Sequence, residues 1–163
     1  MEGVEGPLMI RILFVDQDPT LLEALRLRLH PCRRFWDMDF TDSEEAALAR
    51  LSQRPFDILV ADIDPGVWNG ADLLRIAEIC YPTMKRIAFV GGYRFTHPES
   101  KRAHAFLPKP SDLNAINRLV SQLFPFGPTR PEAGVEMPDR AAPPVGLPGR
   151  ARGRQSRWGG WRT

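Results

Sequence analysis

Apolar residues along the chain follow two alternating patterns: short continuous runs, and runs with a spacing of three or four residues. The short runs predict strands at 9–15, 36–40, 58–62, 86–90 and 103–107. The helical spacing predicts helices over about 18–30, 41–51, 71–80 and 111–123. Strands and helices in alternation predict an α/β fold on a parallel sheet, and right-handed crossovers favour a doubly wound arrangement.

Residues with strong local preferences mark where these elements begin and end. Asp18 before Pro19 suits the N-terminus of the first helix, and Pro31 suits its end. Ser111 suits the N-cap of the last helix. The fifth strand is expected to stop before Pro108, because proline does not donate a hydrogen bond to a sheet.

Composition divides the chain into an extension at 1–7, a domain at 8–124 and a tail at 125–163. The tail is rich in proline, glycine and arginine and has few residues for a core, which predicts disorder. The net charge is only +2, yet five arginines and no acidic residue lie at 150–163. With Trp158 and Trp161 this stretch is a candidate for weak binding of RNA or another polyanion. Short arginine-rich tracts have low specificity, so a tail without a binding function is the favoured alternative.

Several classes of protein are excluded by what the sequence lacks. No apolar stretch approaches the roughly 18 residues of a membrane span, and the acidic N-terminus does not resemble a signal peptide. Cys32 and Cys80 have neither metal-site nor disulfide-framework spacing, so we expect two reduced thiols in a cytoplasmic protein. The chain has no nucleophile elbow, no glycine-rich phosphate loop and no zinc motif, so we do not expect an enzyme.

The strand predicted at 58–62 ends abruptly in a carboxylate, Asp62, followed by turn residues. Open α/β sheets bind their ligands at the carboxyl ends of strands, near the point where the strand order reverses. This single strand-end aspartate is therefore a candidate site residue.

Three groups of residues together resemble a bacterial response-regulator receiver domain. They are the run Ile12–Asp16, then Asp62 with Gly70 eight residues later, and the pair Lys109 and Pro110. The resemblance covers about residues 8–124. Within it, the sequence from residue 33 to residue 91 looks most like receivers attached to HDOD or HD-GYP output domains. No output domain is expected in this chain.

The resemblance implies a flavodoxin-like fold with five parallel strands in the order 2-1-3-4-5. It implies that Asp62 is the phosphoacceptor and that Asp16 and Asp62 hold Mg²⁺. Lys109 would pair with the phosphoryl group. These roles are chemically reasonable, because a carboxylate can attack a phosphoryl group and Mg²⁺ offsets the repulsion between two anions.

The chain departs from the family pattern at several positions. Gln17 stands where a second acid of the metal pair is usual, and Val90 stands where a Ser or Thr hydroxyl is usual. Phe106 has the switch-aromatic position without a tyrosine hydroxyl, and we expect it to pack in the core. Asp18 is expected to cap a helix rather than to bind metal. The segment after Val90 is short and contains Pro98, which predicts a shortened fourth helix.

Two functional hypotheses remain. In the first, the protein is a stand-alone receiver in a two-component phosphorelay that accepts phosphate on Asp62 from a histidine kinase and modulates a protein–protein interaction. In the second, it is a pseudo-receiver that binds a protein partner independently of phosphorylation. Asp16, Asp62 and Lys109 would then be only an internal charge network.

Overall fold

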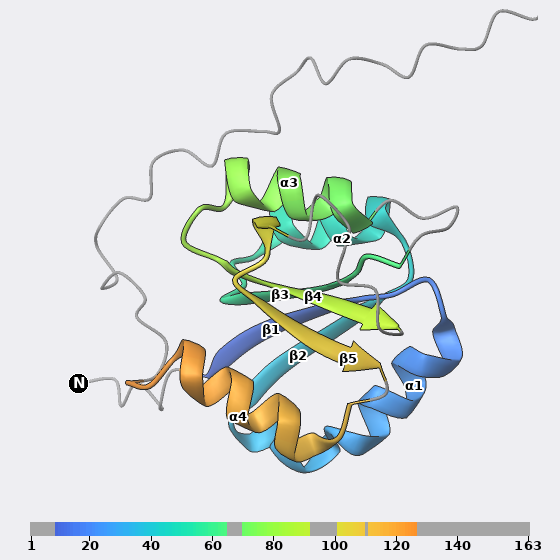
Figure 1. Cartoon of the computed structure of the whole chain (residues 1–163), viewed down its shortest axis with the longest axis vertical. Coiled ribbons are helices and arrows are strands. Elements are labelled where there is room, and N and C mark those ends of the chain that lie inside the picture. Colours follow the sequence, from blue (N-terminus) through green and yellow to red (C-terminus); the bar gives the residue numbers. More distant parts are fainter. Residues whose placement is uncertain (1–8, 65–69, 92–100, 110, 127–163) are drawn as a thin grey trace, which may run out of the picture.

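A five-stranded parallel sheet with helices on both faces forms the centre of the structure (Figure 1). The computed structural model describes residues 9–64, 70–91, 101–109 and 111–126. The strands are β1 (Ile10–Val15), β2 (Trp36–Thr41), β3 (Ile58–Asp62), β4 (Lys85–Gly91) and β5 (Ala105–Lys109). The helices are α1 (Pro19–Arg28), the 3₁₀-helix η1 (His30–Arg34), α2 (Glu44–Gln53), α3 (Gly70–Cys80) and α4 (Leu113–Leu123).

The strands lie in the order β2-β1-β3-β4-β5, and every neighbouring pair is parallel. This confirms the flavodoxin-like order that the sequence implied. The order reverses between β1 and β3, so the carboxyl ends of these two strands flank a crevice. Asp16 and Asp62 stand at those two ends.

Alternate residues of each strand face two separate halves of the core. One half lies against α1 and α4 and contains Phe14, Val60 and Phe89; Phe14 also stacks on Phe40 with ring centroids 5.0 Å apart. The other half lies against α2 and α3 and contains the intervening strand residues. Both faces of β3 are buried, which explains its continuous apolar sequence. Figure 1 shows the two pairs of helices on opposite sides of the sheet.

Of the two helix caps predicted from the sequence, one is confirmed and one is not. Asp18 caps α1, and its Oδ1 accepts hydrogen bonds from the backbone N–H groups of Thr20 (2.9 Å) and Leu21 (3.3 Å). The prediction that Ser111 caps the last helix was wrong. Asp112 caps α4, and the buried Ser111 hydroxyl donates instead to the Pro108 carbonyl.

Several predicted boundaries need correction. The second helix begins at Glu44 rather than about 41, and the last helix begins at Leu113 rather than 111. The first helix ends at Arg28 rather than His30, and Pro31 lies inside the following 3₁₀-helix. The fifth strand is Ala105–Lys109 rather than 103–107, and it includes Pro108. Proline is tolerated there because β5 is an edge strand. An edge strand has no neighbour on its outer side, so no inter-strand hydrogen bond is lost there when an N–H is absent.

Several sequence-based predictions lie outside the described residues. These are the extension at 1–7, most of the shortened helix between β4 and β5 (92–100), and the tail from 127 onward with its proposed polyanion binding. Within the described part of the chain, every helix is too short or too polar to span a bilayer.

Candidate functional site

A cleft of about 430 Å³ opens at the carboxyl ends of β1, β3 and β5. Seven residues line the cleft: Asp16, Gln17, Asp18, Leu21, Asp62, Asp64 and Lys109. All three site residues taken from the family resemblance therefore meet in one place. Their side chains come from three separate strands or strand ends.

Strand alternation determines which side chains reach the cleft. Phe14, Val60 and Leu107 face the core half beneath α1 and α4. Side chains two residues further along a strand point to the same face. Asp16, Asp62 and Lys109 are these next residues, so each apolar column ends in a charged group at the edge of the sheet.

Lys109 holds the centre of the site. Its Nζ lies 2.6 Å from Asp16 Oδ2, 2.9 Å from Asp62 Oδ1 and 3.3 Å from Asp64 Oδ2. The same ammonium lies 5.0 Å from the centroid of the Phe89 ring, which forms its apolar floor. Asp16 and Asp62 are each 1% exposed. Three carboxylates thus share one ammonium in a poorly hydrated place, and the ionised site is left with excess negative charge.

The two strand-end aspartates are fixed by their own loops. Asp16 Oδ1 accepts the Asp18 N–H at 2.9 Å, and Asp62 Oδ1 accepts the Asp64 N–H at 2.9 Å. Such contacts to the residue two positions later close a tight turn directly after each strand. The second oxygen of Asp16 is buried, and among the described residues no donor gives it a hydrogen bond of good geometry.

The charge imbalance appears in the protonation equilibria. Burial raises the pKa of Asp62 above its usual value, and the Asp16 charge adds to the effect, against the opposing contacts with Lys109 and the Asp64 N–H. Burial by itself lowers the pKa of Lys109, but the carboxylates of Asp16 and Asp62 outweigh it and raise that pKa overall. The ammonium is therefore firmly charged at neutral pH, whereas the ionised form of Asp62 is disfavoured.

Asp62→Asn is expected to raise the free energy of unfolding at neutral pH by about 1 kcal/mol, because the amide removes a disfavoured charge. Since the pKa of Asp62 is raised on folding, ionised Asp62 costs stability above the folded-state pKa. The cost disappears below the unfolded-state pKa. The gain of Asp62→Asn should therefore shrink as pH falls through the folded-state pKa. Urea unfolding at a series of pH values measures it.

The matched control for this substitution is Asp72→Asn on α3, which removes one half-exposed carboxylate that does not line the cleft. Its free energy of unfolding should stay within about 0.5 kcal/mol of the wild type at every pH. A loss of stability in Asp62→Asn at neutral pH would contradict the excess negative charge of the site.

The position opposite Lys109 is Gly91, and this corrects the expectation for Val90. Asp62 pairs with Phe89 in the sheet register and Lys109 pairs with Gly91, so these residues share one face. Val90 faces the other way and is buried in the core half beneath α2 and α3. The site thus lacks a hydroxyl at this position because it has a glycine there, and Val90 is a core residue.

Sequence reasoning missed Asp64 and Gly91. Asp64 accepts a hydrogen bond from the Gly91 N–H with both carboxylate oxygens, at 2.8 and 3.0 Å. The sequence signal was present, since Asp64 lies two residues after Asp62 and a glycine pair follows the strand predicted at 86–90. Only the pairing of β3 with β4 brings Asp64 and Gly91 together.

The other predicted residues have clear positions. Gln17 lines the cleft and is exposed, so the place of the usual second acid carries an uncharged amide. Asp18 also lines the cleft, but its Oδ1 caps α1 as expected. Phe106 was expected to pack in the core, and this was wrong: its side chain is 39% exposed because β5 is an edge strand.

The donor set fits a hard divalent cation. Mg²⁺ is usually bound by one or two carboxylates and keeps several waters, so Asp16 and Asp62 suffice as protein ligands. The excess negative charge of the site, three carboxylates around one ammonium, favours such an ion. Among the described residues, no group of three or more His, Cys, Asp or Glu side chains is placed to hold a metal ion by itself.

Comparisons with known proteins agree with this geometry. The chain is 35% identical over 81 residues to the two-component response regulator ORR21 of rice (Oryza sativa subsp. indica), which covers 47% of this chain and 11% of that protein. No family model matches the chain. The chain therefore spans about a tenth of the length of the curated relative that it matches.

Solved structures show the same fold at low sequence identity. Chemotaxis protein CheY4 of Vibrio cholerae is 18% identical with a TM-score of 0.61, over 71% of this chain and 99% of that chain. Response regulator TrrA of Thermotoga maritima, in complex with Mg²⁺ and beryllofluoride, is 22% identical with a TM-score of 0.61 over the same shares. The fold is therefore the CheY-like receiver fold.

Proposed function

We propose that this protein is a receiver domain of a two-component phosphorelay that accepts a phosphoryl group on Asp62. The observation that carries the proposal is the convergence of Asp16, Asp62 and Lys109 in one cleft, with the Lys109 ammonium 2.6 and 2.9 Å from the two carboxylates. The donor would be a partner histidine kinase in the cytoplasm. Among receivers it would stand closest to those of HDOD or HD-GYP regulators.

The site supplies the parts that phosphoryl transfer to a carboxylate needs. An Asp62 oxygen attacks phosphorus, the new O–P bond forms, and the N–P bond to the kinase histidine breaks. The backbone N–H of Asp64 holds the Asp62 carboxylate in one orientation, and the Lys109 ammonium offsets the charge of the incoming group. Mg²⁺ bound by Asp16 and Asp62 would supply further positive charge to the phosphoryl oxygens.

The result of phosphorylation would be a change in how the domain binds a protein partner. The phosphoryl group adds charge beside Lys109, and such charge can bias an existing two-state equilibrium of the nearby surface. Gly91 has no hydroxyl that could bind the phosphoryl group, and Phe106, at the switch-aromatic position, lacks the hydroxyl of a tyrosine. The bias should therefore be smaller than in a receiver with both hydroxyls. The protein would act as a signalling module rather than as a turnover enzyme.

A phosphorylation-independent pseudo-receiver is the second candidate, and one observation favours it. Lys109 already contacts three carboxylates, so the charged groups form a closed network without any ligand. In that case the network would only hold β1, β3 and β5 together beneath a constitutive docking surface. The two candidates differ in whether Asp62 takes up a phosphoryl mimic.

The deciding experiment is an amide NMR titration of the full chain, first with Mg²⁺ and then with Mg²⁺ and beryllofluoride. We expect shifts that spread from Asp62 to Lys109 and α4, and none of them in Asp62→Asn. A wild-type spectrum that stays unchanged with beryllofluoride, from a folded protein, would remove the phosphorelay proposal and leave the pseudo-receiver.

A further inference from the structure

The Asp64 side chain turns back into the cleft and uses two donors. Its carboxylate accepts the Gly91 N–H with both oxygens, and Oδ2 lies 3.3 Å from Lys109 Nζ. The side chain is 30% exposed, so water can reach it and a swing outward into solvent is open to it. The Asp64 backbone N–H stays on Asp62 in the same turn.

A phosphoryl group on Asp62 would need the same kind of donors in the same place. Backbone N–H groups and an ammonium are the standard partners of phosphate oxygens. Lys109 Nζ lies 2.9 Å from Asp62 Oδ1 and also forms an ion pair with Asp64. The exposed Gly91 N–H donates to Asp64 alone among the described acceptors. An anion on Asp62 and the Asp64 carboxylate therefore have to share, or exchange, one set of donors.

Gly91 is what allows this arrangement. A Cβ at residue 91 would lie 2.6 Å from Asp64 Oδ2, closer than real Cβ contacts. Gly91 lies at the end of strand β4 and its φ is not in the left-handed region, so the backbone itself does not demand a glycine. The absence of a side chain at residue 91 instead leaves the space that the Asp64 carboxylate occupies.

We propose that Asp64 is an internal anion that competes with the phosphoryl group for the Gly91 N–H and for Lys109. In the unphosphorylated protein the Asp64 carboxylate occupies the Gly91 N–H and Lys109. Phosphorylation of Asp62 requires the Asp64 carboxylate to move away from these donors. This inference rests on the proposed function. It assigns to Asp64 and Gly91 the control of how readily Asp62 is loaded.

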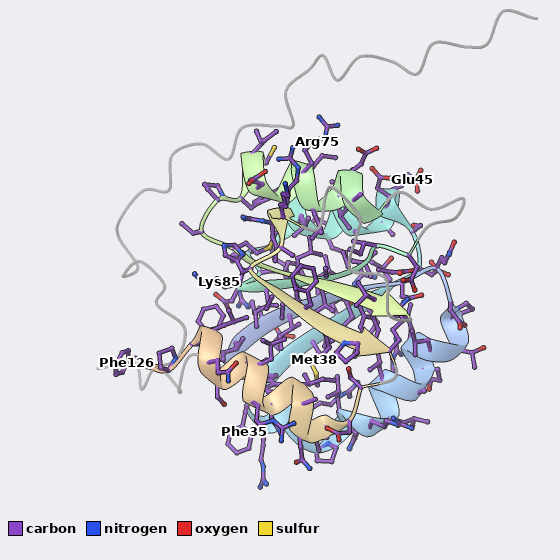
Figure 2. The ribbon with its side chains drawn as sticks, in the orientation of Figure 1. Phe35, Met38, Glu45, Arg75, Lys85 and Phe126 are labelled. Atoms are coloured by element: carbon purple, nitrogen blue, oxygen red, sulfur yellow. The ribbon has the colours of Figure 1, made fainter. Side chains whose placement is uncertain are left out.

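The test is the beryllofluoride affinity of the full chain in the presence of Mg²⁺, measured by amide NMR titration. Asp64→Ala should bind beryllofluoride at least about tenfold more tightly than the wild type, because a competing charge close to the ligand is removed. Gly91→Ala should also bind more tightly, because its methyl group excludes the carboxylate while leaving its charge on the chain. Glu45→Gln removes an exposed charge on α2 (Figure 2) and should leave the affinity unchanged.

A second measurement tests the contact without any ligand. Gly91 is exposed, so protection of its amide hydrogen depends on the Asp64 carboxylate. Asp64→Ala should speed hydrogen exchange at Gly91 at least about tenfold and leave exchange in β1 unchanged. Unchanged exchange at Gly91 would overturn the inference whatever the beryllofluoride result.

The outcomes separate this inference from the proposed function. If the wild type binds beryllofluoride and Asp64→Ala binds it no more tightly, the competition is refuted while the proposed function stands. Binding in Asp64→Ala but not in the wild type supports both. Binding in no variant overturns both, because removal of the competitor would then have released no phosphoryl site.

Discussion

Replacement of Lys109 by methionine is expected to lower the free energy of unfolding by about 3–5 kcal/mol at neutral pH without divalent cations. Methionine keeps most of the aliphatic length but removes the only ammonium that Asp16, Asp62 and Asp64 share among the described residues. Two of these carboxylates are almost fully buried, so they lose their counter-charge where water cannot replace it. Urea unfolding followed by circular dichroism measures the loss.

The matched control is Lys85→Met, which changes a half-buried lysine at the opposite end of β4 from Gly91 (Figure 2). It should cost less than about 1 kcal/mol. Combining Lys109→Met with Asp62→Asn should restore a large part of the loss, because the two substitutions remove opposite charges that interact. A Lys109→Met protein as stable as the wild type would show that the acids are neutral, and would contradict the charge model of the cleft.

Phe89→Ala is expected to cost a similar amount, about 3–5 kcal/mol. The ring is 2% exposed at the centre of the core half beneath α1 and α4, on the strand between β3 and β5. Its removal leaves a cavity directly under the cleft and takes away the aromatic face 5.0 Å from the Lys109 ammonium. The measurement is again the free energy of unfolding in urea, with the slope checked for two-state behaviour.

Phe106→Ala provides the comparison, since Phe106 lies on the adjacent strand and is 39% exposed. Its cost should be smaller, about 1–2 kcal/mol, because less apolar area is lost from the interior. Equal losses for the two phenylalanines would contradict the different burial of their rings. A smaller loss for Phe89→Ala would mean that the core half beneath the cleft collapses to fill the space.

The charged cleft is compatible with a phosphorylated receiver and with a phosphorylation-independent pseudo-receiver for the same physical reason. Carboxylates at the ends of buried strands are costly unless a cation is present, and Lys109 supplies only one positive charge for three acids. The remaining negative charge attracts a divalent cation, as phosphoryl chemistry requires, yet the ammonium network is also stable by itself. Uptake of beryllofluoride on Asp62 therefore discriminates between them better than any measurement of stability.

The sequence by itself determined most of the elements and one acid of the site, Asp62, because their signals are local. Continuous apolar runs predicted buried strands, and Asp18 before Pro19 predicted the start of α1. Asp62 was found because it directly ends an apolar strand, and open α/β sheets bind their ligands at such ends. Asp16 and Lys109 were identified through the family resemblance, and the structure places both in the same cleft as Asp62.

The tertiary structure alone decided what faces these residues across the sheet. Side chains alternate along a strand, so an error of one residue in register moves a side chain to the opposite face. This is why the family resemblance assigned the hydroxyl position to Val90, whereas pairing with β5 puts Gly91 opposite Lys109. The return of Asp64 onto Gly91 joins residues 27 positions apart, and it depends on the register of β3 and β4, which no local pattern encodes.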